Sequence, residues 1–596
     1  MLDGFRHDMP FGAQLCAGGV RFRLYAPQAT RVEVFTTTSG RDRSMPLTSV
    51  DSGWFEAVDD CARAGTRYAF SLDGAVLRVP DPASRFQPDG VHGPSMVVDP
   101  TLFEWTGSWN GLPWTEHVFY ELHVGTFTPE GTFAAARTKF DHLVALGITA
   151  LELMPLAECP GERNWGYDGV LPFAPSHNYG TPEELKAFIS DAHAHGLAIY
   201  LDVVYNHFGP EGNYLHGYAP TFYTSRHQTP WGAAIDADNA IARAFFSENA
   251  LYWTHEYRFD GLRLDAVHAI YDGPERHFLR ELARTVAERS DRRIFLVLEN
   301  DRNEAALLEA GFRAQWNDDA HHAMHVIVTG ERDGYYRDYA ADPVALLGKA
   351  LTTGFGYQGD FSAYRTAERG TPSEQLRLGS FVTFLQNHDQ IGNRPFGDRL
   401  GARAPSAALR AVVAVYLLAP SPPLLFMGEE WGASSPFLYF CDFEPELARA
   451  VTAGRRSEFG SFAGFADPAA RESIPDPSAR ATFERSKLDW DEVACDTHAA
   501  WLAYYRNLLA LRRAEVAPRI AGVRGTDTSS KRVGSAGLQA RFRLDDGTML
   551  TLDANLGACE ESGFAAHPGG YVLFCTHDPT YPNSIAPPWS VRWTLA

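Results

Sequence analysis

The first part of the chain alternates apolar and polar residues with a period of two. Val20, Phe22 and Leu24 form one such run, and similar runs follow it, separated by turns that contain Gly or Pro. Alternate side chains of a strand point to opposite faces, so this pattern predicts strands with one buried face. We therefore predict a small all-β domain over residues 1–95. Its last part, residues 78–95, is rich in Pro and Gly and is expected to be a connector.

A different pattern begins at residue 118, where short apolar runs alternate with longer amphipathic stretches. This alternation is typical of βα units, in which helices join parallel strands. The predicted strands lie at residues 118–123, 150–154, 198–204, 261–265, 294–299, 312–317, 380–387 and 423–428. The predicted helices lie at residues 133–146, 182–195, 240–257, 274–288, 407–418 and 499–513, the second of them between an N-cap at Thr181 and a C-cap at Gly196. Eight strands with intervening helices predict an α/β fold, a (β/α)8 TIM barrel, over residues 96–517.

The barrel region is longer than a simple barrel requires, because about 250 residues suffice for eight βα units. The additional residues must form insertions on the loops, which we expect at residues 155–180, 208–238, 318–378 and 429–490. After the last helix, period-two alternation returns at Leu538, Ala540 and Phe542 and again near the end of the chain. This predicts a C-terminal β-sandwich over residues 518–596.

Composition and charge exclude several classes of partner. Lys and Arg total 53 against 74 Asp and Glu, a net charge of −21, which disfavours nucleic acid and anionic membrane surfaces. The most apolar long stretch, residues 407–426, contains Arg410 and three prolines, so it is not expected to span a membrane. Seven cysteines without any CxxC pair predict neither disulfides nor a zinc site. With no basic and apolar leader at the start, we expect a soluble, cytoplasmic protein.

Polar clusters follow five of the eight predicted strands of the barrel. They are Glu121 and His123, Asp202 with Asn206 and His207, Arg263 with Asp265, Glu299, and Asn387 with His388 and Asp389. Active sites of such barrels are built at the carboxyl ends of the strands, so these side chains are expected to converge on one site. Unpaired buried carboxylates are energetically costly. The recurrence of Asp265, Glu299 and Asp389 at three strand ends therefore favours a catalytic cluster over isolated structural hydrogen bonds.

Paired carboxylates suit the hydrolysis of glycosides, in which one acid protonates the leaving oxygen and the other attacks the sugar or activates water. Arg263 lies two residues before Asp265, on the same side of the strand, and is expected to keep Asp265 ionised as the nucleophile. Aromatic residues in the rim loops could stack on sugar faces: Trp165, Tyr167, Tyr205, Trp316, Phe396 and Trp431.

Other chemistries lack their motifs. His321 and His325 have the spacing of zinc ligands, but the glutamate of an HExxH motif is missing, so we expect no metal. The chain contains neither GxxxxGK[ST] nor GxSxG, which disfavours phosphoryl transfer on a P-loop and acyl transfer by an α/β-hydrolase. No cofactor is expected.

The chain resembles the α-amylase family of retaining glycoside hydrolases. The similarity lies in DVVYNH at 202–207, GLRLDAVH at 261–268, LVLEND at 296–301 and FLQNHD at 384–389, in the order that the family shows. It implies a carbohydrate-binding, immunoglobulin-like β-sandwich before the barrel and a β-sandwich after it. It also implies Asp265 as the nucleophile, Glu299 as the general acid and base, and Asp389 as the residue that stabilises the transition state. The residues implied to line the attacked sugar are His207, Arg263, His388 and Tyr167, with Asp202 as their support.

Segments outside these motifs are similar to members that act on maltooligosyltrehalose, among them FYELHVGTFTPEGTF and LLFMGEEWGASSPFLYFCDF. This implies cleavage of the α-1,4 bond next to a terminal trehalose unit, with trehalose and a maltooligosaccharide as products. It also implies a maltooligosyltrehalose synthase that supplies the substrate, and we expect a monomer. Asn300 and Asp301 directly follow the acid and are expected to reach the leaving sugar. The expected substrate-binding set is completed by Trp165, Tyr205, Trp316 and Arg394.

Two alternatives remain open from the sequence. Branching and debranching enzymes share the four motifs and the N-terminal sandwich, so the motifs alone do not exclude them. A sugar-binding protein on a barrel that has lost catalysis is the other alternative, although Asp265 and Glu299 are both retained. Retention of configuration predicts a separation of about 5 to 5.5 Å between these two carboxyl groups.

Overall fold

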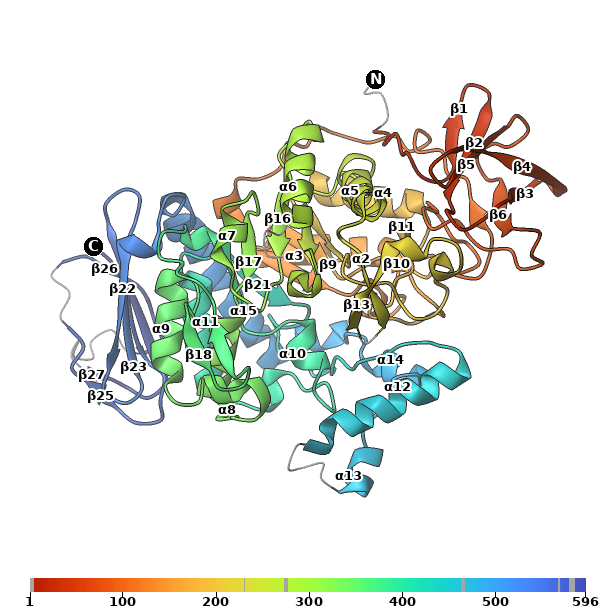
Figure 1. The fold of residues 1–596 in the computed structure, drawn as a ribbon. Coiled ribbons are helices and arrows are strands. Elements are labelled where there is room, and N and C mark those ends of the chain that lie inside the picture. Colours follow the sequence, from red (N-terminus) through yellow and green to blue (C-terminus); the bar gives the residue numbers. More distant parts are fainter. Residues whose placement is uncertain (1–4, 230, 273–276, 462–466, 566–568, 578–584) are drawn as a thin grey trace.

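The structure is a computed structural model that describes residues 5–229, 231–272, 277–461, 467–565, 569–577 and 585–596. The N-terminal β-domain and the C-terminal β-domain lie at opposite ends of the molecule, with the barrel between them (Figure 1). Two helices of the last barrel insertion, α12 (Pro445–Glu458) and α13 (Pro468–Glu472), extend away from the barrel at the lower side of the view.

The N-terminal domain consists of seven strands in the order β1-β2-β5-β4-β3-β6-β7. Their bounds are β1 (Gln14–Cys16), β2 (Gly19–Tyr25), β3 (Val32–Thr38), β4 (Arg41–Asp51), β5 (Trp54–Asp59), β6 (Arg67–Leu72) and β7 (Ser95–Met96). The long strand β4 pairs with β3 through one part and with β5 through another. Phe22 of β2 packs against Tyr68 of β6, with ring centroids 4.9 Å apart. The alternation predicted around Val20, Phe22 and Leu24 is confirmed, since all three side chains are buried.

The central domain is a closed barrel of eight parallel strands, as predicted. In chain order these are β8 (Phe119–Leu122), β9 (Ala150–Leu153), β12 (Ala198–Val203), β15 (Gly261–Leu264), β16 (Phe295–Leu298), β17 (Ala314–Trp316), β20 (Phe381–Phe384) and β21 (Pro423–Phe426). Each strand pairs with the next in this order, and β21 closes the barrel on β8. The seventh strand is shorter than the predicted 380–387, because Asn387 already caps the short helix α10 (His388–Gly392).

Most predicted helices are present: α4 (Pro182–Ala194), α5 (Ala240–His255), α6 (His277–Arg289), α11 (Ser406–Leu418) and α15 (Asp496–Leu511). Residues 274–276 of the predicted helix 274–288 lie outside the described residues. Thr181 forms a capping box with Glu184 at the start of α4. The prediction of one helix over 133–146 is wrong. Thr138 ends α2 (Phe133–Arg137) by donating its side-chain hydroxyl to the carbonyl of Ala135, and α3 (Phe140–Leu146) follows separately.

The insertions form small elements around the carboxyl end of the barrel. The first two contain β10 (Ala157–Glu158) with β11 (Leu171–Pro175), and the hairpin of β13 (Tyr223–Thr229) with β14 (Gly232–Ile235). The third contains α8 (Asp318–Thr329), α9 (Pro343–Thr353) and the pair β18 (Asp360–Ser362) and β19 (Ala367–Arg369). The last contains α12, α13 and α14 (Arg480–Arg485). The short helices α1 (Val124–Phe127) and α7 (Ala305–Leu308) follow the first and fifth barrel strands.

The C-terminal domain is a five-stranded antiparallel sheet with a two-stranded sheet beside it. The larger sheet has the order β22 (Thr528–Val533), β23 (Gly537–Arg543), β24 (Met549–Asn555), β28 (Ser590–Leu595) and β26 (Tyr571–Cys575), and the smaller one pairs β25 (Glu561–Ser562) with β27 (Ile585–Ala586). The larger sheet packs on the barrel through α9 and α11 (Figure 1). The indole nitrogen of Trp593 donates to the carbonyl of Ala414 in α11 at 2.9 Å, which fixes this contact. Within the described part of the chain, none of the helices has the length and apolarity needed to cross a membrane.

Candidate active site

A buried arginine organises the carboxyl ends of the third, fourth and fifth strands. Arg263 Nη1 lies 2.6 Å from Asp202 Oδ2 and 2.8 Å from Asp265 Oδ1, and its Nη2 lies 3.3 Å from Glu299 Oε2. The Arg263 side chain is fully buried, and its guanidinium lies 4.1 Å from the ring centroid of Trp316, close enough for a cation–π contact. One cation therefore holds together three of the carboxylates that the sequence placed at separate strand ends.

Asp265 is held as a carboxylate. Asn206 Nδ2 donates to Asp265 Oδ2 at 2.9 Å, opposite the contact with Arg263. Burial opposes ionisation, but Arg263, Asn206 and His207 together lower the pKa of Asp265 below its ordinary value. Its side chain is 13% exposed, so it is reached from solvent. Asp265 therefore has the properties of a nucleophile.

Glu299 has the opposite tendency. Burial and the neighbouring charge of Asp265 raise the pKa of Glu299 above its ordinary value, although Arg263 acts against them. The backbone N–H of Ala266 donates to Glu299 Oε2 at 2.6 Å. Ala266 adopts a left-handed conformation with φ of 39°, uncommon for a residue with a Cβ, immediately after the nucleophile candidate. Two neighbouring carboxyl groups with pKa values shifted in opposite directions are the arrangement of an acid and a nucleophile.

His388 connects the first and seventh strands. Its Nδ1 lies 2.5 Å from Glu121 Oε1, and its Nε2 lies 2.8 Å from the hydroxyl of Tyr167. Burial opposes protonation, but Glu121 and Asp389 raise the pKa of His388 to about 9. Asp389 follows it in the first turn of α10, and its side chain is 43% exposed. Asp389 is thus the most accessible of the three predicted catalytic carboxylates.

Tyr167 and His207 lie beside this cluster. The hydroxyl of Tyr167 donates to Asp202 Oδ2 at 2.7 Å, and His207 Nε2 lies 2.9 Å from the carbonyl oxygen of Tyr167. Burial and the nearby Asp265 raise the pKa of Asp202 to about 7, against the effect of Arg263. The structure thus brings together Asp202, Tyr167, His207, Arg263, Asp265, Glu299, His388 and Asp389 at one end of the barrel.

Three of the predicted sugar-stacking rings lie behind this cluster instead of at its surface. Trp165 is buried, stacks on Phe437 and donates to the carbonyl of Leu438 at 2.9 Å. Tyr205 is buried and donates to Asn249 in α5. Trp316 is buried beneath Arg263. The expectation that these rings stack on sugar is corrected, because protein side chains already cover their faces.

Two further predicted aromatics, Trp431 and Phe396, differ in burial. Trp431 is fully buried, and its ring centroid lies 4.8 Å from that of Trp490. Phe396 is half-buried.

The remaining predicted residues differ in accessibility. Asn300 is buried and donates to Glu304 at 3.1 Å, whereas Asp301 is 28% exposed and accepts a hydrogen bond from Arg365 at 2.7 Å. Arg394 forms a two-pronged pair with Glu331, at 2.8 and 3.0 Å. Its charge is therefore directed to another protein group.

Sequence reasoning assigned no role to four residues of the site. Glu121 and Asn206 were visible as polar residues at strand ends, but only the fold shows that they contact His388 and Asp265. Trp231, in the turn between β13 and β14, stacks on His207 with ring centroids 3.9 Å apart and is 39% exposed. The fourth, Asp318, begins α8 after the sixth strand, and burial together with Glu299 raises its pKa well above the ordinary value. No motif marks Trp231, whereas Asp318 shares the strand-end position of the others.

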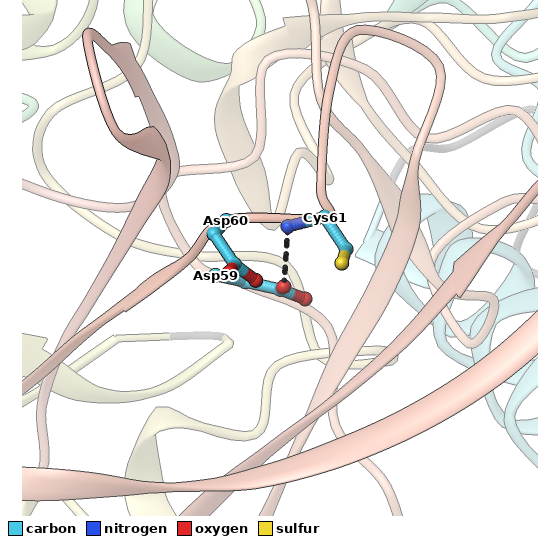
Figure 2. Close-up of side chains that lie close together, drawn as sticks. All are labelled: Asp59, Asp60 and Cys61. Carbon is cyan, nitrogen blue, oxygen red and sulfur yellow. Dashed lines mark hydrogen bonds between the residues drawn. The ribbon is translucent and has the colours of Figure 1, made fainter.

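Potential metal ligands gather at one place among the described residues, in the N-terminal domain. Figure 2 shows Asp59, the last residue of β5, beside Asp60 and Cys61 in the turn that follows. Asp59 is already engaged there, because it accepts the backbone N–H of Cys61 at 2.9 Å and pairs with Arg43 at 3.1 Å. His321 and His325 are engaged elsewhere, at 2.6 Å from the carbonyl of Leu385 and at 2.6 Å from Glu331.

Family models match three parts of the chain. Carbohydrate-binding module 48 (isoamylase N-terminal domain) matches residues 10–84, the alpha amylase catalytic domain matches residues 122–231, and a domain of unknown function (DUF3459) matches residues 528–593. With the closed barrel, these matches define a glycoside hydrolase of the α-amylase class.

Relatives that match most of the chain identify the family within this class. The chain is 45% identical over 499 residues to a malto-oligosyltrehalose trehalohydrolase of Deinococcus radiodurans, covering 83% of this chain and 81% of that one. It is 42% identical to the enzyme of the same name from Arthrobacter ramosus, covering 83% and 87%. A crystal structure named as an alpha amylase candidate from Salmonella typhimurium superposes with a TM-score of 0.92 at 42% identity, covering 98% of this chain and 99% of that one. The chain belongs to the malto-oligosyltrehalose trehalohydrolase family.

Proposed function

We propose that this enzyme hydrolyses the α-1,4-glucosidic bond next to the terminal trehalose of maltooligosyltrehalose, with retention of configuration. Asp265 is the nucleophile, Glu299 is the general acid and base, and Asp389 stabilises the transition state. The products are trehalose and a shortened maltooligosaccharide.

The reaction takes two steps. In the first, the Asp265 carboxylate forms a bond to the anomeric carbon while Glu299 gives its proton to the bridging oxygen, so that trehalose leaves. In the second, Glu299 takes a proton from water, whose oxygen replaces Asp265 on the same carbon. The maltooligosaccharide then leaves with its original α configuration, and Glu299 is protonated again.

The observation that supports this mechanism is that the pKa values of two adjacent carboxyl groups beside one arginine are shifted in opposite directions. Asp265 has a lowered pKa, as a nucleophile requires, and Glu299 has a raised pKa, as a proton donor requires. Arg263 contacts both, at 2.8 and 3.3 Å, so both are within reach of one sugar ring.

Several other residues have geometry suited to holding the attacked sugar. Tyr167, His207 and His388 surround the charged cluster, and Asp389 is exposed beside it. The half-exposed ring of Trp231 offers a flat apolar face next to His207, which is suited to packing on a sugar. Asp301 is the accessible member of the Asn300–Asp301 pair and is assigned to the leaving trehalose.

The choice of substrate rests on the relatives, whose names describe release of trehalose from malto-oligosyltrehalose. The test compares three substrates in parallel: maltooligosyltrehalose, amylose and a branched glucan. We expect free trehalose from the first and little change in the others. New branches in amylose would assign a branching enzyme, and loss of α-1,6 branch points would assign a debranching enzyme.

Inactive variants provide the control for this experiment. Asp265→Ala is expected to abolish trehalose release and Glu299→Gln to lower it at least about 10²-fold, while both variants remain folded and unfold cooperatively. Near-normal turnover in either variant would contradict the assigned roles. If the parent binds maltooligosyltrehalose without cleaving it, the protein is a sugar-binding module instead of an enzyme.

The proposal also concerns the supply of substrate, the oligomeric state and the location of the enzyme. A maltooligosyltrehalose synthase supplies the substrate, and the enzyme acts as a monomer in the cytoplasm. Sedimentation measures the oligomeric state, cell fractionation measures the location, and a coupled assay with the synthase measures trehalose formed from maltooligosaccharides.

A further inference from the structure

The short helix α10 has five residues and carries Asp389 in its first turn. A helix of this length is not stable alone, because its few hydrogen bonds do not offset the cost of nucleation. Its position must therefore be set by contacts with other segments. At its N-terminus, Asn387 forms a capping box with Gln390. Its carboxyl end is held by a distant part of the chain.

Arg455 of α12 contacts the carboxyl end of α10. Its Nη2 donates to the carbonyl oxygens of Gly392 and Arg394, at 2.6 and 3.4 Å. The last carbonyls of a helix have no partner within the helix, and a cationic side chain near this end can supply the missing donor. Arg455 thus joins the last insertion of the barrel to the helix that follows the seventh strand (Figure 1).

The same guanidinium group determines how the side chain of Asn393 is oriented. Arg455 Nη1 donates to Asn393 Oδ1 at 3.3 Å, and Asn393 Nδ2 donates to Asp389 Oδ1 at 3.2 Å. A guanidinium group donates hydrogen bonds and accepts none, so the amide must present its oxygen to Arg455 and its nitrogen to Asp389. The reverse orientation would place two donors together and the amide oxygen against a carboxylate. Arg455 therefore selects the orientation of Asn393 that binds Asp389.

Arg455 is itself held in place by its surroundings. Its side chain is 10% exposed, and its Nη1 lies 3.6 Å from Glu458 Oε2 in the same helix. The ring centroids of Phe459 and Tyr439 lie 4.8 and 5.3 Å from its guanidinium carbon, within the range of cation–π contacts. A side chain packed in this way has lost most of its rotamer freedom, so it can fix the groups that it contacts.

Asp389 requires such support because its side chain is 43% exposed. An exposed side chain on a short helix can adopt several rotamers, and a reacting group that is displaced by a small distance lowers the rate. The second polar neighbour of this carboxylate, His388 Nε2, lies 3.5 Å from Asp389 Oδ1, farther than Asn393 Nδ2 at 3.2 Å. The hydrogen bond from Asn393 is therefore the closer of these two restraints.

We propose that Asn393 and Arg455 are positioning residues, which hold the Asp389 carboxylate in one orientation at the rim of the barrel. This proposal rests on the function proposed above, in which Asp389 stabilises the transition state. It gives the insertion that contains α12 a part in the reaction, because α12 supplies Arg455. Neither residue contacts the sugar, since both act through Asp389.

Initial rates of trehalose release from maltooligosyltrehalose by the full-length protein test the proposal. Arg455→Met removes the guanidinium group, and Asn393→Ala removes the amide. Each variant is expected to lower kcat about ten- to hundredfold, because the displaced carboxylate stabilises the transition state less well. KM is expected to change less than about threefold, since an interaction made in the transition state is lost. An unchanged kcat in either variant would overturn the proposal.

Arg456, the next residue of α12, provides a matched control. Its Nη2 lies 3.4 Å from the carbonyl oxygens of Glu472 and Ile474, so it joins α12 to the end of α13. Arg456→Met is expected to leave kcat nearly unchanged. Equal losses of kcat in Arg455→Met and Arg456→Met would assign the effect to general loosening of α12 and would overturn the proposal.

A double variant distinguishes one connected set of contacts from two independent effects. Arg455 and Asn393 act on the same carboxylate, so their losses should not multiply. The kcat of the variant that combines Arg455→Met with Asn393→Ala is expected to be close to that of the less active single variant. A loss equal to the product of the two single losses would overturn the proposal.

Hydrogen exchange measured by mass spectrometry reports on α10 without any reaction. The backbone N–H groups of Asn393 and Arg394 donate to the carbonyls of Asp389 and Ile391, at 2.9 and 3.2 Å. Exchange in this segment is expected to be faster in Arg455→Met than in the parent and unchanged in Arg456→Met. Equal exchange in Arg455→Met and the parent would overturn the proposal. Failure of the proposed hydrolysis is detected separately, as an absence of trehalose from the parent, and exchange then decides whether Arg455 holds α10.

Discussion

The pair of His388 and Glu121 leads to a quantitative prediction about stability. His388 Nδ1 lies 2.5 Å from Glu121 Oε1, and both side chains are 1% exposed. The pKa of His388 is raised to about 9 in the folded protein, while that of an unfolded histidine is about 6.5. The folded state therefore binds the proton more tightly. This stabilisation is complete below about pH 6.5 and is lost as the pH rises through about 9.

The size of the effect follows from these two pKa values. Their difference corresponds to about 3 kcal/mol of unfolding free energy, lost between about pH 6.5 and 9. Glu121→Gln removes the larger of the two charges that raise the pKa of His388, leaving the exposed Asp389 to act against burial. We expect this variant to be less stable at pH 6.5 by a similar amount, about 3 kcal/mol, and to lose the decline between pH 6.5 and 9.

The neighbouring strand offers a matched control. Glu152 of β9 pairs in register with Glu121 of β8 and is equally buried. Burial, together with the charge of Glu121, raises the pKa of Glu152 well above its ordinary value. Glu152→Gln leaves the pair of His388 and Glu121 intact and is therefore expected to retain the decline.

Urea unfolding at half-unit steps from pH 6 to 9.5 measures the unfolding free energy of the parent, Glu121→Gln and Glu152→Gln. Comparable slopes with pH in the parent and in Glu121→Gln would refute the reasoning. An unfolding free energy of Glu152→Gln that does not change with pH would also refute the reasoning. It would mean that any substitution of a buried glutamate at this layer of the barrel removes the decline.

Four further predictions concern the catalytic cluster. The pH dependence of kcat/KM should be bell-shaped, with an acid limb from Asp265 and an alkaline limb from Glu299, and Glu299→Gln should remove the alkaline limb. Glu299→Gln should also lower kcat by about 10²- to 10⁴-fold; a smaller loss would contradict its role as acid and base. Arg263→Leu should cost about 3–5 kcal/mol in urea unfolding. Arg226→Leu, which removes an exposed arginine paired with two carboxylates, should leave the urea midpoint nearly unchanged; equal losses would count against the central role of Arg263. Trp231→Ala should raise KM by about two- to tenfold with little change in kcat, as measured by initial rates, and an unchanged KM would exclude stacking on substrate.

The opposite pKa shifts of Asp265 and Glu299 also connect stability with function. Keeping Asp265 ionised and Glu299 protonated requires burial next to Arg263, and buried charges are stable only while every partner is present. Ala266 adds a left-handed backbone at the same place. Such strained and charged groups are tolerated because the closed barrel around them fixes their positions.

The order of the residues and their hydrophobic pattern alone determined the strands of this protein and the side chains at their ends. The eight barrel strands were predictable because strands buried on both faces appear as short apolar runs, and their carboxyl ends are fixed once the strands are known. For the same reason Asp265, Glu299 and Asp389 could be assigned to one rim. The N-terminal alternation around Phe22 was equally visible, because period two is a local property of a strand.

Only the tertiary structure decided how these residues interact. The lowered pKa of Asp265 and the raised pKa of Glu299 depend on distances to Arg263, and no local pattern contains those distances. The sequence predicted that the rings of Trp165 and Trp316 stack on sugar at the surface, but neighbouring segments cover them. Trp231 remains accessible. The contact between Trp593 and α11 joins segments far apart along the chain. Sequence determines which side chains are available at each strand end, whereas burial and electrostatic contact arise between segments and are set by packing of the whole chain.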